Sequence, residues 1–134
     1  MVAAVCAWHE RHAEAAREIE TRLARGERLT ALAPTLIEAY AVLTRLPAPH
    51  RLSPGDAWTL IETNFVTPSS AVALTGAAYV KLLRRVAQQA IGGGRTYDAV
   101  IGECAHRGKI DTLLTFNPRH FDPPPAGVIV IEPA

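Results

Sequence analysis

Three residues with oxygen-bearing side chains stand where the chain passes out of an apolar or glycine-rich segment. Glu38 lies in the first turn of the helix predicted after LTALA, and Asp98 lies in the first turn of the helix predicted after a run of glycines. Asn117 directly follows the apolar segment DTLLTF. Ligands of open α/β sheets bind beyond the carboxyl ends of the strands, so we expect these side chains to converge there. Such oxygens suit a hard divalent cation, which could polarise a phosphodiester and activate water.

Each of these residues also has a simpler structural interpretation. Thr35 and Glu38 have the spacing of a capping box, in which Glu38 would only satisfy the N-terminus of its helix. The helix dipole favours an acid such as Asp98 near a helix start. Asn117 followed by Pro118 is a common way to begin a turn. The residues taken singly leave both interpretations open.

Helices and short apolar strands must position these side chains. Helical periodicity predicts helices over residues 11–25, 34–46, 53–65 and 75–90, and a further helix between Thr96 and Gly108. Apolar runs predict strands over residues 29–33, 111–116 and 127–132, and residues 66–74 are ambiguous. Because helices alternate with fully apolar strands, we expect one α/β domain over residues 1–134, with a parallel sheet covered on both faces.

Local signals predict where several helices begin and end. Ser53 is the expected N-cap before Pro54, and Thr96 is the expected cap of the helix that Gly108 ends. Gly26 is placed to end the first long helix. Apolar spacing predicts an inward-facing stripe on each of two helices, made of Ala78, Leu82, Leu83 and Val86 on one, and of Tyr97, Val100, Ile101, Cys104 and Ala105 on the other.

The composition indicates a globular protein without a strong overall charge. Apolar residues make up 49% of the 134 residues, charged residues make up 20%, and the net charge is +1. Such a balance gives no strong field toward nucleic acid or anionic membranes. The two cysteines, Cys6 and Cys104, lack zinc-site spacing and are expected to be buried free thiols in the cytoplasm.

Other motifs that carry chemistry are weak or missing. The run GGGR lacks the Lys-Ser/Thr of a phosphate-binding loop, and no GxGxxG is present. Ser69 and Ser70 lack the surroundings of a nucleophile elbow. His9 and His12 have no further ligands nearby in the sequence and are interpreted as a solvated helix start. The oxygen-bearing residues therefore remain the best candidates.

Four stretches in order resemble the PIN-domain family of metal-dependent ribonucleases, and most closely its VapC toxins. They are VAAVCAWHERHAEA, APTLIEAYAVLTRL, GGGRTYDAVIGECAHRG and DTLLTFNPRHF. The resemblance implies a three-layer α/β/α sandwich with a central parallel sheet, and an acidic pocket that binds Mg²⁺ or Mn²⁺ and cleaves RNA. By this resemblance, Glu38, Asp98 and Asn117 are metal ligands, and Thr115 lines the same pocket.

The resemblance further implies partners, and the start of this chain departs from the family pattern. We expect a VapB-like antitoxin and a homodimer, with residues 79–85 and the region of Trp58 as contact surfaces. Family members begin with a strand that ends in an aspartate, whereas Met1 already lies inside the equivalent of the next helix. We therefore expect the true start to lie upstream, and we expect the chain from Met1 to bind metal weakly, because Mg²⁺ needs carboxylates.

Two other classes of function stay open at this level. The first alternative is a catalytically weakened or inactive PIN-like domain that binds an antitoxin or RNA, which the missing aspartate and the neutral Asn117 favour. The second is a small-molecule-binding α/β domain, for which no motif is present. Glu38, Asp98 and Thr115 together favour the ribonuclease.

Overall fold

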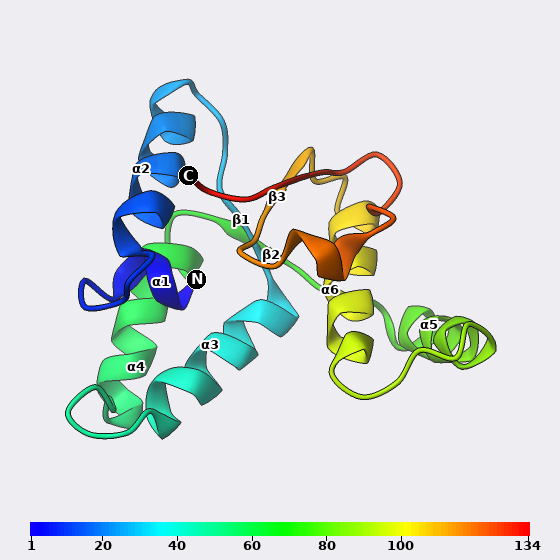
Figure 1. Ribbon diagram of the computed structural model, residues 1–134, viewed down its shortest axis with the longest axis horizontal. Helices are drawn as coiled ribbons and strands as arrows, with labels where there is room; N and C mark the ends of the chain where they lie inside the picture. Colours follow the sequence, from blue (N-terminus) through cyan, green and yellow to red (C-terminus); the bar gives the residue numbers. More distant parts are fainter. The chain divides into compact units, whose positions relative to one another are not determined.

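The computed structural model describes residues 1–134, which divide into two compact units (Figure 1). The first unit contains residues 1–71 and Ala134, and the second contains residues 72–133. Both mix helices with short strands, which confirms the predicted α/β class. At 13 residues, the longest helices are too short to cross the hydrocarbon layer of a membrane, and none is apolar enough.

The first unit is mostly helical. It contains α1 (Val2–Val5), α2 (His12–Ala24), β1 (Thr30–Leu32), α3 (Ala33–Arg45), α4 (Pro54–Ile61) and a π-helical turn η1 (Glu62–Val66), and β2 (Ser70–Val72) pairs with β1 at its end. Ser53 caps α4 as predicted, since its hydroxyl accepts a hydrogen bond from the Asp56 amide at 3.1 Å. Gly26 follows α2 with a φ of +84°, the left-handed conformation that glycine adopts most easily.

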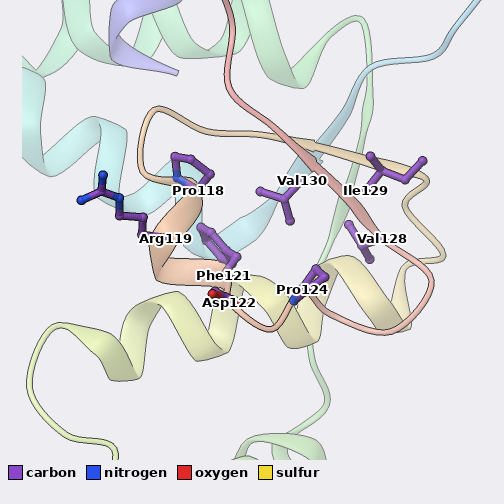
Figure 2. A pocket seen from close by; sticks show the side chains of 8 residues that line it. All are labelled: Pro118, Arg119, Phe121, Asp122, Pro124, Val128, Ile129 and Val130. Atoms are coloured by element: carbon purple, nitrogen blue, oxygen red, sulfur yellow. The ribbon is translucent and has the colours of Figure 1, made fainter.

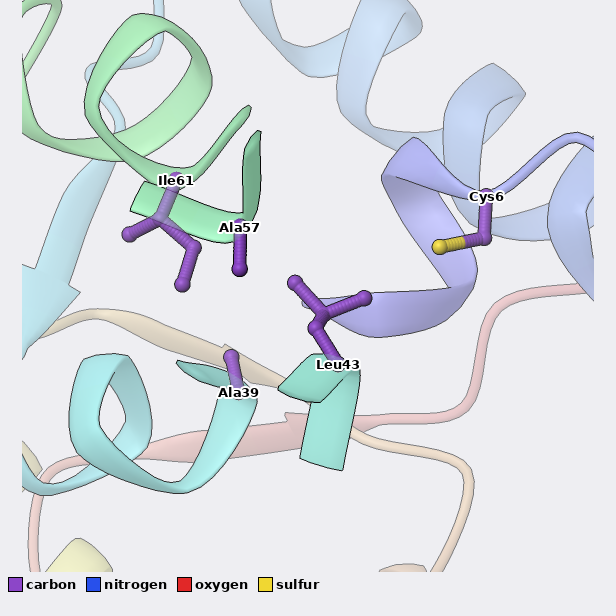
Figure 3. Packing of buried hydrophobic residues seen from close by; sticks show 5 residues of the cluster. All are labelled: Cys6, Ala39, Leu43, Ala57 and Ile61. Carbon is purple, nitrogen blue, oxygen red and sulfur yellow. The ribbon is translucent and has the colours of Figure 1, made fainter. Parts of the chain in front are cut away.

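Leu43 lies at the centre of the core of this unit. Its side chain is 1% exposed and stands between Cys6, after α1, and Ala57 and Ile61 of α4 (Figure 3). The helices α3 and α4 pack against each other through these residues. Burial raises the pKa of the Cys6 thiol, which confirms the expected buried free cysteine.

The second unit places a parallel strand pair beside two helices. It contains α5 (Gly76–Gln88), α6 (Arg95–Arg107), β3 (Thr112–Leu114), a 3₁₀ turn η2 (Pro118–Phe121) and β4 (Ile129–Ile131). The strands β3 and β4 run parallel, with Leu113 opposite Val130. In both units the sheet has two strands, so the three-layer sandwich with one central sheet stays a prediction.

Helix α6 begins earlier than predicted. Gly94 is its N-cap, and the amides of Thr96 and Tyr97 already donate to the carbonyls of Gly93 and Gly94. Thr96 therefore lies inside the first turn, and the prediction that it caps the helix was wrong. Cys104 and Ala105 are fully buried as expected, and burial also raises the pKa of the Cys104 thiol.

Two residues of the predicted apolar stripes lie in solvent instead. Tyr97 is 72% exposed, because it lies two turns before Cys104, at a helix end that no other element covers. Leu83 is 54% exposed, because α5 packs mainly against α6 and buries only a narrow row, namely Ala78, Leu82 and Val86. The stripes are thus shorter and narrower than spacing alone predicted.

Gly108 ends α6 as predicted, and the structure shows that its lack of a side chain matters more than its backbone conformation. Its own φ is −75°, and the left-handed residue is Lys109, with a φ of 53°. A Cβ on Gly108 would approach the Cys104 carbonyl oxygen and Val72 Cγ1 to 2.9 Å each. Glycine is needed here because the backbone passes close to these atoms.

Glu103 joins the two helices of the second unit. Its carboxylate, 10% exposed, pairs with Arg85 of α5 at 3.0 Å and with Arg107 of α6 at 2.6 Å. Burial alone would raise the pKa of Glu103, but the hydrogen bonds from Arg107 and Arg85 outweigh it and lower that pKa below 4.5. The ionised carboxylate therefore stabilises the contact between α5 and α6.

We expect Leu43→Ala to reduce the free energy of unfolding by about 2–5 kcal/mol, because it removes buried methyl groups and leaves a cavity. Urea denaturation followed by circular dichroism measures this loss. Ile37→Ala on the same helix is the matched control, since Ile37 is 72% exposed. Equal losses in the two variants would contradict the placement of Leu43 in the core.

We expect Glu103→Gln to cost about 1–2 kcal/mol at pH 7, between the values for an exposed and a buried charged hydrogen bond. Because the folded-state pKa is lowered, the stabilisation is present above the ordinary value of 4.5 and is lost as the pH falls below it. Urea denaturation at several pH values should show the variant and the parent converging in acid. Asp111→Asn, at an exposed site, is the control; a difference that does not change with pH would contradict the ion pair.

Candidate functional site

Asp98 lies in the first turn of α6, as predicted, with its side chain 20% exposed. Both of its ion-pair contacts are made by one carboxylate oxygen, Oδ2. His120 Nδ1 lies 3.2 Å from it, and Arg95 Nε lies 4.0 Å from it. Both partners thus approach the carboxylate on the side of Oδ2. A ligand could then bind from the side of the other oxygen, Oδ1.

Thr115 and Asn117 lie just past the carboxyl end of β3. The Thr115 amide donates to the Ile131 carbonyl at 3.0 Å, which extends the β3–β4 ladder by one residue. The Thr115 hydroxyl oxygen then accepts a hydrogen bond from the Asn117 amide at 3.1 Å. The side-chain amide of Asn117 makes no hydrogen bond within the chain, so its oxygen is free to bind a ligand.

Hydrogen bonds and one ion-pair contact link these residues to Asp98 along the chain. Asn117 is the N-cap of η2, and its carbonyl accepts from the His120 amide at 3.0 Å. The His120 ring in turn contacts the Asp98 carboxylate. Asp98 is thus linked to Asn117 and Thr115 through η2, while the convergence of their side chains on one ligand stays a prediction.

Glu38 lies in the first unit, in the second turn of α3 rather than in the first. The capping-box interpretation was wrong, because the N-cap is Leu32, which has no side-chain acceptor, and the Thr35 hydroxyl donates to the Leu32 carbonyl. Burial lowers the pKa of the Met1 amino group, and the neighbouring Glu38 carboxylate opposes that shift. Glu38 thus has no capping role and lies beside Met1, while its approach to Asp98 stays a prediction.

Sequence reasoning missed His120 and Arg95. The signal for His120 was present in NPRHF, because His120 stands three residues after Asn117, the N-cap, and residues three apart in a 3₁₀ turn lie on the same side. The ring could be assigned to Asp98 only once η2 was seen to contact α6. Arg95 stands three residues before Asp98, which is a contact spacing on any helix.

The side chains available in the second unit suit a hard cation better than a soft one. The candidate donors are a carboxylate, an amide oxygen and a hydroxyl, which are ligands of magnesium and manganese rather than of zinc. No group of three His, Cys, Asp or Glu residues in the chain is arranged to hold a metal. With one carboxylate among these candidate donors, the set fits Mg²⁺ or Mn²⁺ as part of a site rather than as a complete one.

An open apolar pocket of about 580 Å³ lies on the same unit, beside η2 and β4 (Figure 2). Its walls include Phe121, Val128 and Val130, with Arg119 and Asp122 as the charged residues. None of the predicted ligands lines it. A cation held by Asp98 would therefore lie outside this pocket.

Comparisons with known protein families and proteins show what this chain is similar to. The family model of the PIN domain matches residues 1–123. Ribonuclease VapC40 of Mycobacterium tuberculosis is 38% identical over 102 residues, which are 76% of this chain and 70% of that protein. Ribonuclease VapC27 of the same species is 40% identical over 79 residues, 58% of this chain and 56% of that protein. No solved structure matches the chain.

Proposed function

This chain belongs to the PIN-domain family, and we propose from this premise that it is a metal-dependent endoribonuclease toxin of the VapC type. The observation that carries the proposal is the Asp98 carboxylate, which His120 and Arg95 approach on the side of Oδ2. It lies in the unit that also places Thr115 and Asn117 after β3. Two relatives named as ribonucleases support the choice of RNA as substrate.

Mg²⁺ or Mn²⁺ bound there would polarise the scissile phosphodiester and lower the pKa of a water molecule. Asp98 would supply Oδ1, Asn117 its amide oxygen, and Glu38 a second carboxylate from the first unit. The Thr115 hydroxyl oxygen already accepts a hydrogen bond, so its hydrogen can be donated to a phosphate oxygen. Arg95, 55% exposed beside Asp98, adds positive charge near the RNA backbone.

The proposal includes the finer features that the family resemblance implies. We take residues 1–134 as one domain with the three-layer α/β/α sandwich, and the family match, which runs through both units, supports this. A VapB-like antitoxin is the proposed partner, and the cytoplasm is the proposed location, which the free buried thiols support.

A non-catalytic antitoxin- or RNA-binding domain is the second candidate. One observation favours it: among the candidate ligands of the second unit only Asp98 has a carboxylate, and Asn117 is neutral. Such a domain would bind RNA or an antitoxin equally well with and without a divalent cation. The ribonuclease, in contrast, would lose its activity when the cation is removed.

We expect the full-length protein to cleave a mixed single-stranded RNA pool in the presence of Mg²⁺ or Mn²⁺, and to lose this activity in EDTA. Asp98→Asn and Glu38→Gln should each reduce the cleavage rate by more than about 100-fold. Loss of a residue that only hydrogen-bonds to a metal ligand already lowers metal affinity or activity by about 10–100-fold, and loss of the ligand itself should cost more. Gel electrophoresis of end-labelled RNA measures the rate.

The control for this experiment is Asp111→Asn, because Asp111 is exposed and precedes β3 at its opposite end. It should cleave at the parent rate, and all variants should melt within a few degrees of the parent. Metal-dependent cleavage that survives Asp98→Asn would falsify the site assignment. RNA binding without any cleavage would favour the non-catalytic domain.

We also propose that a second copy of the chain covers part of α5. Val80 is 59% exposed and Leu83 is 54% exposed, three residues apart on one side of the helix. Trp58 of α4, at 48%, is the exposed aromatic residue of the other predicted contact region. Large apolar side chains grouped in this way are more typical of an interface than of free surface.

The double variant Val80→Glu and Leu83→Glu should weaken self-association at least tenfold, because each buried aliphatic side chain contributes about 1.5–3 kcal/mol. Sedimentation velocity at several concentrations measures it. Lys81→Glu, at an exposed position between the two, is the control. A parent protein that stays monomeric at about 100 μM would contradict the dimer.

A further inference from the structure

The contacts of the Asp98 carboxylate are asymmetric, and this asymmetry points to a role for His120. We propose that His120 is a positioning residue that holds Asp98 Oδ2 and thereby directs Oδ1 toward the divalent cation. The inference rests on the proposed function, since it assumes that Asp98 binds a metal. It adds a residue that the predicted ligand set of Glu38, Asp98 and Asn117 did not contain.

The favourable tautomer of the His120 ring follows from the chemistry of the two groups. His120 Nδ1 lies 3.2 Å from Oδ2, in an ion-pair contact rather than an aligned hydrogen bond. A carboxylate carries no hydrogen, so the favourable tautomer of the ring has its hydrogen on Nδ1, facing Oδ2. The neutral imidazole with its hydrogen on Nδ1 suffices for this contact. Arg95 Nε, at 4.0 Å, is too far away to form a hydrogen bond and contributes charge rather than direction.

A close contact of this kind matters because the carboxylate is otherwise free to turn. The terminal torsion of aspartate has a broad, roughly two-fold preference, so either oxygen could face the ligand. With Oδ2 in contact with His120, one orientation is selected before any cation arrives. Outer partners of metal ligands generally act in this way, and their removal costs about 10–100-fold in metal affinity.

The fold holds His120 in place through its neighbours rather than by burying it. The imidazole itself is 45% exposed, but the next residue, Phe121, is 8% exposed. Phe121 and Pro125 pack over Gly102 of α6, where an added Cβ would meet Pro125 Cγ at 3.1 Å and Phe121 Cδ1 at 3.9 Å. Gly102 lies one turn after Asp98, so this packing fixes η2 beside the carboxylate.

The same turn ties His120 to another proposed ligand. The His120 amide donates to the Asn117 carbonyl at 3.0 Å, and Asn117 is the N-cap of η2. A shift of η2 would therefore move both the Asn117 side chain and the group that orients Asp98. We infer that η2 sets the distance between these two ligands, with His120 as the contact that transmits it.

A purely structural ion pair would behave differently. A half-exposed pair contributes about 0–1 kcal/mol to stability, so losing His120 should hardly change the melting temperature in either case. Metal affinity separates the two interpretations, because only a positioning residue acts on the binding of the cation. The readout should therefore be binding of Mn²⁺ alone, in the absence of RNA.

The experiment compares full-length proteins by electron paramagnetic resonance of free Mn²⁺. His120→Ala should raise the dissociation constant for Mn²⁺ by about 10–100-fold. His120→Asn should restore it to within a few-fold of the parent, since the asparagine NH₂ group stands near the place of Nδ1 and also donates. His106→Ala is the matched control, because His106 is an exposed histidine of α6 whose Nδ1 contacts the Ala126 carbonyl at 2.8 Å instead.

Each outcome has one meaning. Weak binding by His120→Ala, recovery by His120→Asn and no change in His106→Ala would establish the positioning role. Parent-like binding by His120→Ala would overturn it and leave the proposed ribonuclease standing. Binding by His120→Asn as weak as that of His120→Ala would overturn the donor role, because the imidazole itself would be required. A parent protein that binds no Mn²⁺ would overturn the metal site of the proposed function as well.

Discussion

Gly102 has no side chain, and this allows Pro125 and Phe121 to lie directly against α6, one turn after Asp98. The contact fixes η2, which carries His120 to the carboxylate and presents Asn117 at its own N-terminus. A Cβ at position 102 would lie 3.1 Å from Pro125 Cγ, so Pro125 would have to move by a few tenths of an ångström. The arrangement of donors in the second unit thus depends on a close approach between a helix and a loop.

The parallel pairing of β3 with β4 supplies the other half of this arrangement. The ladder continues past β3 to the Thr115 amide, so the chain leaves the sheet in a defined direction before η2 begins. Beyond the carboxyl end of a strand, backbone and side-chain oxygens no longer serve the sheet and can bind ligands. Thr115 and Asn117 stand at that point, and the charge of Asp98 comes from the helix beside them.

The two units use different means of support. The first depends on apolar packing around Leu43, and Glu38 lies on an exposed part of the same helix. The second binds α5 to α6 partly through the Glu103 carboxylate between two arginines. Glu38 and Asp98 thus lie on helices that are held by different kinds of contact.

The sequence by itself determined the helices and strands, the chemistry of the candidate ligands and the family. Periodicity, the Ser53 cap and short apolar runs are local, and local rules set them whatever the tertiary context. Only the tertiary structure decided that Thr96 lies inside α6, that Tyr97 and Leu83 face solvent, and that Glu38 is not a cap. Only it brought His120 to Asp98, because that contact joins residues 22 positions apart through the packing of η2 on Gly102, which no spacing in the chain encodes.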